Sequence, residues 1–343
     1  MAIGSGLSSQ FAMKSEVTPG TYLAPDRFFE TTDMDGDADL TYIEGSGLKS
    51  GARFKRLAQV GISRVSASGT ATLPMTMKNM GILWKYMIGS TATAVQISTT
   101  SAWKQIHNPG TTFTGISTTI QEGKPDAAGT IQPFSFTGSK ITDWEITIAD
   151  GEETKLKLTW DAWNCVTSQT LVATSYVTVN DTWNFADCNI FKLGGTASQS
   201  AGETIITAGA AVATAVKSFT LAGTNHFATD RYGLGNAGTK LEQIENDFCE
   251  ITGSFSGELN IAQMRVPFIA GSTVPIQIDS TGPVISGANN YLLSFIIAGA
   301  KLTEYSSSVS GPDLIDCSGT FRAYDDEVNP VLQTKIVSTD VAV

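Results

Sequence analysis

An internal repeat constrains the fold of this chain more than any other feature of its sequence. Residues 138–163 begin with Gly-Ser-Lys-Ile-Thr-Asp-Trp, and residues 299–324 begin with Gly-Ala-Lys-Leu-Thr-Glu-Tyr. The segments align without a gap, because their first residues (299 − 138 = 161) and their last residues (324 − 163 = 161) are equally far apart. Tyr or Phe in the second segment stands at each Trp of the first. A repeat on this scale indicates a duplicated domain rather than a solenoid of short units.

Three shorter matches precede this repeat in the same order. They pair 24–28 with 228–232, 89–91 with 271–273, and 95–97 with 276–278. The spacing falls from 204 (228 − 24) to 182 (271 − 89) and then to 161, so the first copy is the longer one. We therefore expect two similar domains, residues 1–195 and residues 196–343, joined within the small polar stretch 194–200.

Alternating apolar and polar residues predict antiparallel strands in both copies. Apolar residues stand at 144, 146 and 148 before a turn at 150–151, and at 156, 158 and 160 after it. A period of two on both sides of a turn predicts a hairpin with one buried face. Similar runs occur at 65–75, 218–221, 248–259, 291–297 and 331–337. About 75 Ser and Thr residues and 33 Gly among 343 residues also favour strands and turns.

One segment has the period of an amphipathic helix. Its apolar residues are Met80, Leu83, Trp84, Met87 and Ile88. Asn79 is placed to cap its start, and Gly89 is placed to end it. The second copy offers only 261–266 before Pro267, because proline disfavours helical backbone at the preceding residue. We expect a mainly β protein, in which each copy is an antiparallel sandwich or barrel with one short helix.

Composition and charge exclude several classes of protein. The net charge of −11 argues against a general nucleic-acid binder, which needs clustered Lys and Arg to neutralise phosphates. The longest apolar run, 292–300, is half the length of a membrane span. Residues 1–6 have neither the basic start nor the apolar core of a secretory signal. Four scattered cysteines are too few for a disulfide framework or a zinc cluster, so we expect reduced thiols, a cytosolic fold and no cofactor.

Residues 33–44 have part of the spacing of a calcium-binding loop. Oxygen ligands would stand at positions 1, 3, 5 and 12, which are Asp33, Asp35, Asp37 and Glu44. Ala38 stands at position six, where the sharp turn requires Gly, and two glycines would fall in the helix that should follow. We favour a solvated acidic loop and keep calcium as the alternative.

Two further patterns point only weakly to a cofactor or to catalysis. Residues 233–238 read Gly-Leu-Gly-Asn-Ala-Gly, but polar residues rather than an apolar parallel strand precede them, so a turn fits better than a dinucleotide site. His107 and His226 are the only histidines, and we expect both at surface or turn positions. The sequence contains no Gly-x-Ser-x-Gly elbow to present a nucleophilic serine. Carboxylates assembled in space could still form a hydrolase site.

One segment separates its charges sharply. Residues 30–44 carry only acidic charges, and residues 49–64 carry only basic ones. One interpretation is a solvated hairpin. The other is an assembly interface, in which the segment of one subunit docks on a neighbour through complementary charge. Its residues would be Asp33, Asp35, Asp37, Asp39, Lys49, Arg53, Lys55 and Arg56.

Motifs spread over nearly the whole chain carry a family resemblance. They are Ser-Gly-Leu-Ser-Ser-Gln-Phe at 5–11, Glu-Val-Thr-Pro-Gly-Thr-Tyr at 16–22, Ala-Pro-Asp-Arg-Phe at 24–28, Lys-Ser-Gly at 49–51, Met-Ile-Gly-Ser at 87–90, Asp-Arg-Tyr-Gly-Leu-Gly at 230–235, Glu-Asn-Asp at 245–247 and Val-Ser-Thr-Asp at 337–340. In these motifs the chain resembles the major tail tube proteins of phages with long non-contractile tails. The acidic run at 33–39 departs from the pattern expected there.

The resemblance implies β-sandwich tube domains with a flanking helix, which form six-fold rings around a channel and stack through extended hairpins and loops. It implies a siphovirus-type virion protein that is assembled in the host cytoplasm. Its partners would be copies of itself, the tail tip or terminator protein and the tape-measure protein, with no membrane. DNA would pass through without specific binding, since an acidic lumen repels phosphate. Two domains per chain would let three chains supply six quasi-equivalent positions, so we expect a trimeric, pseudo-hexameric ring.

Two other functions remain open from the residues alone. A secreted or surface pair of β-domains could recognise carbohydrate, and a signal sequence would favour that alternative. A hydrolase could assemble its carboxylates from distant segments. We rank a structural, self-assembling virion protein first, the carbohydrate-binding module second and the hydrolase third.

Overall fold

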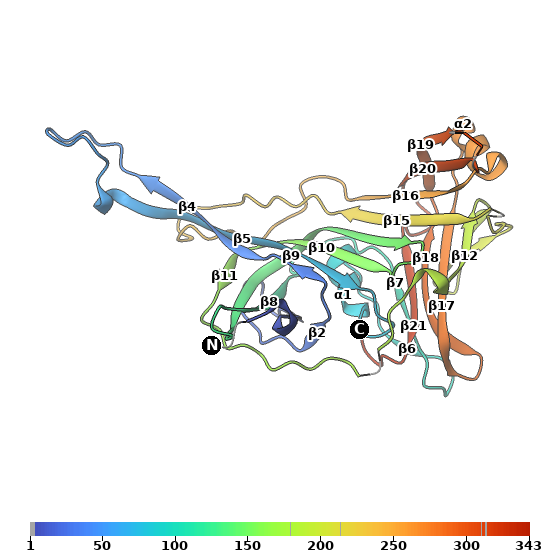
Figure 1. Ribbon diagram of the computed structural model, residues 1–343, viewed down its shortest axis with the longest axis horizontal. Coiled ribbons are helices and arrows are strands. Elements are labelled where there is room, and N and C mark those ends of the chain that lie inside the picture. The colour runs from blue at the N-terminus through green and yellow to red at the C-terminus, as the bar shows by residue number, and fades with distance from the viewer. Residues whose placement is uncertain (1–3, 179, 213, 310, 313) are drawn as a thin grey trace.

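Antiparallel β-sheets make up most of the computed structural model, which describes residues 4–178, 180–212, 214–309, 311–312 and 314–343 (Figure 1). The first three residues of the N-terminal stretch 1–6, where the sequence predicts no secretory signal, lie outside the described part. The strands form a 13-stranded sheet, a six-stranded sheet and a two-stranded ribbon. The predicted mainly β, antiparallel fold class is therefore confirmed.

The 13-stranded sheet is the main sheet of the molecule. Its path runs β19 (Ala300–Ser308), β20 (Asp316–Ala323), β16 (Glu250–Glu258), β15 (Val216–Thr224), β9 (Ile131–Ala149), β10 (Lys155–Ala162), β5 (Val60–Pro74) and β3 (Asp33–Met34). Off this path, β4 (Asp37–Glu44) follows β3 along β5, and β1 (Gln10–Ser15), β2 (Arg27–Phe29), β8 (Thr118–Pro125) and β11 (Asn164–Val166) also attach. Because β15 pairs with β9, the main sheet continues from one predicted half of the chain into the other.

The six-stranded sheet also combines strands from both ends of the chain. Its order is β12 (Cys188–Leu193), β17 (Ile276–Ser286), β18 (Asn289–Ile297), β21 (Gln333–Ser338), β7 (Trp103–His107) and β6 (Val95–Gln96). The ribbon consists of β13 (Thr196–Ser200) and β14 (Glu203–Thr207). The polar stretch 194–200, predicted to be a linker, is thus a paired strand over its last five residues, because its partner in the sequence, β14, follows after a tight turn.

Strand alternation places one apolar face of the main sheet against the second sheet. In β9, Trp144, Ile146 and Ile148 are buried, while the residues between them face the other way. The rings of Phe191 in β12 and Phe219 in β15 lie 6.0 Å apart between centroids and join the two sheets. The molecule is therefore sandwich-like, with its main core between the sheets.

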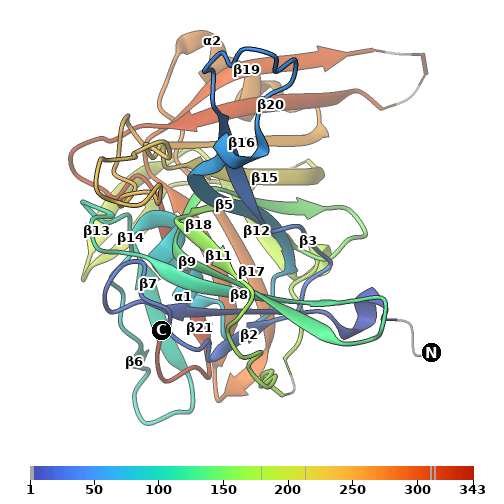
Figure 2. The same cartoon turned by 90° about the vertical axis from the view of Figure 1, so that its left-hand side faces the viewer.

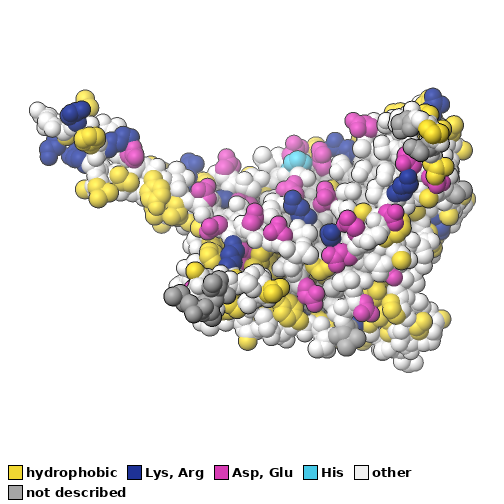
Figure 3. All heavy atoms as spheres, viewed as in Figure 1, with side chains coloured by type: hydrophobic (Ala, Val, Ile, Leu, Met, Phe, Trp, Pro, Cys, Tyr) yellow, Lys and Arg dark blue, Asp and Glu magenta, His cyan; other side chains and the backbone are white. Residues whose placement is uncertain are grey.

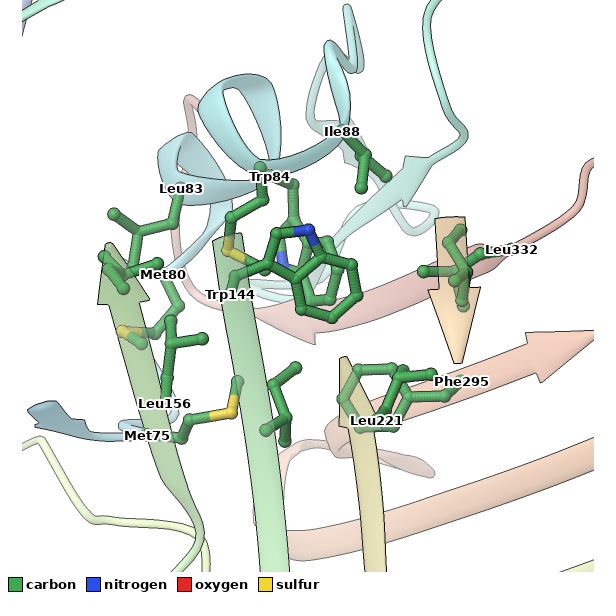
Figure 4. Close-up of a cluster of buried hydrophobic side chains, with 14 of the residues drawn as sticks. Met75, Met80, Leu83, Trp84, Ile88, Trp144, Leu156, Leu221, Phe295 and Leu332 are labelled. Carbon is green, nitrogen blue, oxygen red and sulfur yellow. The ribbon is translucent and has the colours of Figure 1, made fainter. Parts of the chain in front are cut away.

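Helix α1 (Gly81–Ile88) fills one side of this core (Figure 4). The Trp84 ring lies 6.0 Å from Trp144 of β9 and 5.9 Å from Phe295 of β18, so the helix contacts both sheets. Gly89 ends the helix in the left-handed conformation at φ 69°, as the sequence predicts. The predicted cap is wrong: Met80 is the N-cap residue, and the Asn79 amide instead contacts Arg27 and the Phe28 carbonyl.

The second helical segment is longer than predicted. A π-helical turn, Ile261–Arg265, continues directly into α2 (Val266–Ala270), which ends at the left-handed Gly271. Pro267 lies inside the segment rather than beyond it, because the first turn of an α-helix tolerates the missing N–H of proline. Short 3₁₀ turns occupy Gly6–Ser8, Leu57–Gln59 and Phe185–Asp187.

Candidate assembly surfaces

A long hairpin projects from one end of the main sheet (Figure 1). We call residues 40–65 the arm: the outer parts of β4 and β5 and the segment that joins them. Almost every residue of the arm is exposed, including large apolar side chains. Leu48, Phe54 and Leu57 are each at least 84% exposed. Apolar groups gathered on a projecting element are typical of a surface that docks on another protein.

Basic side chains gather at the tip of the arm, whereas acidic side chains are scattered over the body (Figure 3). Lys49, Arg53, Lys55 and Arg56 all lie in the exposed segment between β4 and β5. Lys55 pairs with Glu44 at the end of β4. The structure therefore brings the basic half of the predicted interface onto the arm.

The acidic half of the predicted interface lies at the base of the arm, along β3 and β4. The Asp35 carboxylate accepts the N–H and hydroxyl of Thr70, each at 2.9 Å. Asp37 accepts the backbone N–H of Ala38 at 2.7 Å. The side-chain carboxylates of Asp33 and Asp39 have no hydrogen-bond or ion-pair partner within the described ranges, and both residues are exposed.

The calcium-loop alternative does not fit this fold. Asp37 and Glu44 are the first and last residues of β4, an extended strand of eight residues. An extended strand rises about 3.3 Å per residue, which separates the Cα atoms of these two residues by roughly 23 Å. Asp33, Asp35, Asp37 and Glu44 therefore do not converge, and the described residues contain no group of acidic, His or Cys side chains that could hold a metal.

The outer face of the main sheet is polar and lined largely by hydroxyl groups. In the central strands these side chains include Thr147 of β9, Thr159 of β10, Thr220 of β15 and Ser254 of β16. Asp143 and Glu145 in β9 face the same way, across from Lys157 in β10.

The strand order of the main sheet runs through one pattern twice. β4, β5, β10 and β9 lie side by side, and β15, β16, β20 and β19 continue in that order. Strands β10 and β20 begin 161 residues apart (316 − 155) and end 161 residues apart (323 − 162). A register shift falls between Thr159 and Trp160 in the first run and between Thr320 and Phe321 in the second, again 161 apart.

The strand–helix connections of the two runs also correspond. β5 leads to α1 and the left-handed Gly89, and β16 leads to α2 and the left-handed Gly271, at φ 69° and 59°. The predicted match of 24–28 with 228–232 is the exception. Residues 27–29 form β2, which precedes β3, whereas 228–232 follow β15, the strand that takes the place of β3 and β4.

The junction between the two runs is a continuous antiparallel pairing of β9 with β15. It extends from Ala149 opposite Ser218 to Asp143 opposite Thr224. The Thr224 hydroxyl donates to the Asp143 carboxylate at 2.9 Å. On the core side, Gly223 leaves room for the Trp144 ring, since a Cβ there would lie 2.3 Å from it. We call this pairing the internal junction.

The path of the main sheet from β19 to β3 ends in two strand edges. At one end, a single bridge between Lys301 and Thr273 is the only pairing of described residues on the outer side of β19. At the other end, β3 and β4 pair with β5 on their inner side. Glu122 and Lys124 of β8 bind the backbone N–H and carbonyl of Gly36 between them. Exposed edges are sites at which another chain can add a strand.

Residues 225–249 connect β15 to β16 as the arm connects β4 to β5, but this loop folds back onto the first run. Lys240 forms a nearly buried ion pair with Asp161 of β10. Burial raises the pKa of Asp161, and its contacts with Lys240 and Gln243 oppose that rise. Lys140 of β9 binds Glu242 at 2.9 Å. The sequence does not predict this docking, because Lys240 and Glu242 are single charged residues in a loop and their partners are far away in sequence.

Within this loop, residues 233–238 form a turn, as predicted. Gly235, Ala237 and Gly238 have positive φ values of 88°, 50° and 78°. The Gly238 carbonyl accepts the N–H of Val65 at 2.9 Å. Tyr232 places its ring 4.7 Å from the Arg64 guanidinium, so the loop also contacts the base of the arm.

The prediction of a surface position is wrong for His107, which is fully buried in β7. Its ring nitrogens contact the Ser90 hydroxyl and the Gln105 side chain, each at 3.2 Å. Burial lowers its pKa to about 4. His226 is partly exposed and lies 3.9 Å from Glu250. All four cysteines are free thiols.

Comparison with known proteins identifies the family. A family model described as phage tail tube protein matches residues 6–323, more than nine-tenths of the chain. No curated protein matches this chain. Neither helix in the described ranges is long and apolar enough to span a membrane. The chain therefore belongs to the phage tail tube protein family and is a structural, non-enzymatic component of the virion.

Proposed function

We propose that this protein assembles into rings of three chains, each contributing two tube domains, and that the rings stack into the tail tube of a siphovirus-type phage. The domains are residues 1–195 and 196–343, interlocked through shared sheets. The observation that carries the proposal is the strand order of the main sheet, in which β4-β5-β10-β9 is followed by β15-β16-β20-β19.

A ring follows from this order if the contact between neighbouring chains repeats the contact between the two runs of strands within one chain. β9 pairs with β15 inside the chain. The strand at the place of β9 in the second run is β19, and the strands at the place of β15 in the first run are β3 and β4. Each chain thus carries two different ends that can join head to tail, and a head-to-tail contact closes into a ring when its rotation divides a full turn. Three chains give six positions and a pseudo-hexameric ring.

In such a ring the polar face of the main sheet lines the channel, and the second sheet lies outside. Ser and Thr side chains predominate on this face, with charges of both signs among them. DNA passes such a wall without specific binding, because retention of phosphate requires clustered Lys and Arg. The tube then acts as a conduit for DNA ejection.

Stacking of rings uses the arm. Its exposed apolar residues and basic tip need a partner surface, and the acidic body of another copy supplies complementary charge. The loop 225–249 supports this role, since its own docking on the first run combines buried ion pairs with backbone contacts. The family resemblance adds the tail tip or terminator protein and the tape-measure protein as partners, with assembly in the host cytoplasm.

Electron microscopy of the purified full-length protein tests the proposal. We expect rings or tubes to form as the protein concentration is raised, with no other component added. A protein that remains monomeric at high concentration, with its β-rich circular dichroism spectrum intact, would contradict self-assembly.

A further inference from the structure

We propose that the rings close by pairing of β19 of one chain with β4 of the next, in the register of the internal junction. This inference rests on the proposed function, and it specifies which residues of the two copies meet. It places Asp37 opposite Ser306, Ala38 opposite Tyr305 and Asp39 opposite Glu304.

The register follows from the positions that correspond in the two runs. Ala222 pairs with Thr252, which pairs with Arg322. Asp37 pairs with Ser68, which pairs with Asp161, the residue 161 positions before Arg322. Asp37 therefore takes the place of Ala222. The residue opposite Ala222 is Glu145, and 161 positions later stands Ser306.

Side-chain volumes at the core side of the two junctions fit this register. Inside the chain, Trp144 stands opposite Gly223, whose missing side chain leaves room for the large ring. Between chains, Tyr305 takes the place of Trp144, and Ala38 takes the place of Gly223. Tyr has a smaller ring than Trp, and Ala is larger than Gly, so the summed side-chain volume of the pair is similar in the two junctions.

A second copy of the chain is the partner that these edges fit. Residues of β4 are all exposed, and so are Glu304 and Ser306 on β19. The two edges differ in sequence and occur once each on every chain. A head-to-tail contact between copies satisfies both edges at once, whereas a foreign strand on one edge would leave the other open.

The junction between chains is shorter than the internal one. The internal junction continues through Leu221, which pairs with Ile146. At the corresponding Gly36, Glu122 accepts the backbone N–H and Lys124 donates to the carbonyl. These side chains occupy the place of a partner strand, so the new pairing runs from Asp37 toward the arm. A shorter junction makes the contact between chains weaker and therefore raises the protein concentration that ring closure needs.

The outward-facing pairs also differ in charge. Thr224 donates a hydrogen bond to Asp143 in the internal junction. Asp39 and Glu304 replace them between chains, and two carboxylates directly opposite one another destabilise a pair of strands. The internal junction therefore forms with each folded chain, while the junction between chains forms less readily.

Cysteine cross-linking tests the register. In the internal junction, the Asn225 N–H binds the Thr142 carbonyl and the Asp150 N–H binds the Lys217 carbonyl. This alternation makes Ala222–Glu145 a non-hydrogen-bonded pair with close side chains, and Asp37–Ser306 corresponds to it. The exposed Cys249 is first replaced by Ser. We expect the D37C/S306C variant to form disulfides between chains under mild oxidation, in a ladder that ends at the trimer.

Three controls separate the possible outcomes. D33C/S306C places a thiol four residues away on the same edge and should not cross-link. A222C/E145C should form a disulfide within the chain. S306C alone should remain unlinked, and its dimerisation would overturn the proposal in favour of two β19 edges pairing with each other. Rings visible by microscopy without the D37C/S306C cross-link would overturn the register alone, whereas failure to form rings at all would overturn the proposed function as well.

A single substitution tests the opposed carboxylates. D39T recreates the Thr–carboxylate pair of the internal junction, and we expect it to lower the concentration of half-assembly about two- to five-fold. D33T removes an equal charge outside the pairing and should leave that concentration unchanged. A D39T protein that assembles no more readily than D33T would overturn the placement of Asp39 opposite Glu304.

Discussion

His107 shows how a single residue can be misjudged from its neighbours in sequence. The following Asn-Pro-Gly favours a turn, but residues 108–110 leave the strand as an irregular loop, and His107 itself is the last residue of β7. Its side chain points inward, where the Trp84 ring lies 6.1 Å away. Local rules mark only the end of the strand, whereas the burial of His107 depends on how β21 and β7 pair across more than two hundred residues.

The buried position of His107 predicts a pH dependence of stability. Its pKa is about 4 in the folded chain and 6.5 in the unfolded chain. Between pH 6.5 and 4 the unfolded state therefore binds a proton that the folded state does not. As the pH is lowered through this window, the free energy of unfolding falls by up to about 1.4 kcal/mol per pH unit. Urea unfolding of the monomer at pH 7 and pH 5 measures this loss.

The H107N variant isolates the contribution of this residue. It should lose less stability than the wild type between pH 7 and pH 5, whatever its stability at pH 7. H226N, at the partly exposed histidine, is the comparison variant. Equal losses in all three proteins would show that His107 does not control this dependence.

Gly223 lies where the internal junction packs tightly against the core. A methyl group there would lie 2.3 Å from the Trp144 ring, which is itself buried in the core. We expect G223A to lower the free energy of unfolding by about 1–3 kcal/mol. G61A is the matched control, because a Cβ on this β5 glycine has no neighbour within 4 Å. Similar denaturation midpoints for the two variants would argue against tight packing at the junction.

Among the elements, those with a strong local period could be predicted from the sequence. Helix α1 and the β9–β10 hairpin formed where the spacing of apolar residues and the Asp-Gly turn placed them. The pairing of β15 with β9 could not be predicted, since it joins segments about seventy residues apart in sequence and no local pattern encodes it.

The arm was predicted in part. Its separation of acidic and basic residues indicated an exposed hairpin or an interface, and the structure exposes it. Its counterpart, the loop 225–249, contains similar turn residues, yet it folds onto the first run through Asp161 and Lys140. Alternation and turn chemistry describe both segments equally well. The difference lies in long-range contacts: the loop 225–249 has partners on β9 and β10, whereas the arm extends away from the body of the same chain.

Reversing the charge of the arm tip tests its role in stacking. We expect R53E/K55E/R56E to form rings but few tubes, because the basic tip no longer complements an acidic neighbour. Tube length in electron micrographs is the measurement, and R53K/R56K, which keeps the charge, should resemble the wild type. Wild-type tubes should also shorten with rising salt, since exposed charges are screened beyond about 8 Å at physiological ionic strength. Tubes unaffected by either change would remove the electrostatic role.

At the scale of the whole molecule, one sheet carries both the fold and the proposed assembly. Its apolar face packs on the second sheet. The strands at the two ends of its path, β19 and β3, lie well apart (Figure 2). The repeat in the sequence and the doubled strand order share the same spacing of 161 residues. A chain built in this way contains one copy of the contact that would join it to its neighbours.

The number of chains in each ring tests this account most directly. Cryo-electron microscopy of the assembled protein, averaged without imposed symmetry, measures it from a cross-section of the tube. We predict three chains per ring, with six similar lobes that alternate between the first and second runs of strands. Six chains per ring, or a cross-section whose neighbouring lobes come from the same half of different chains, would contradict it.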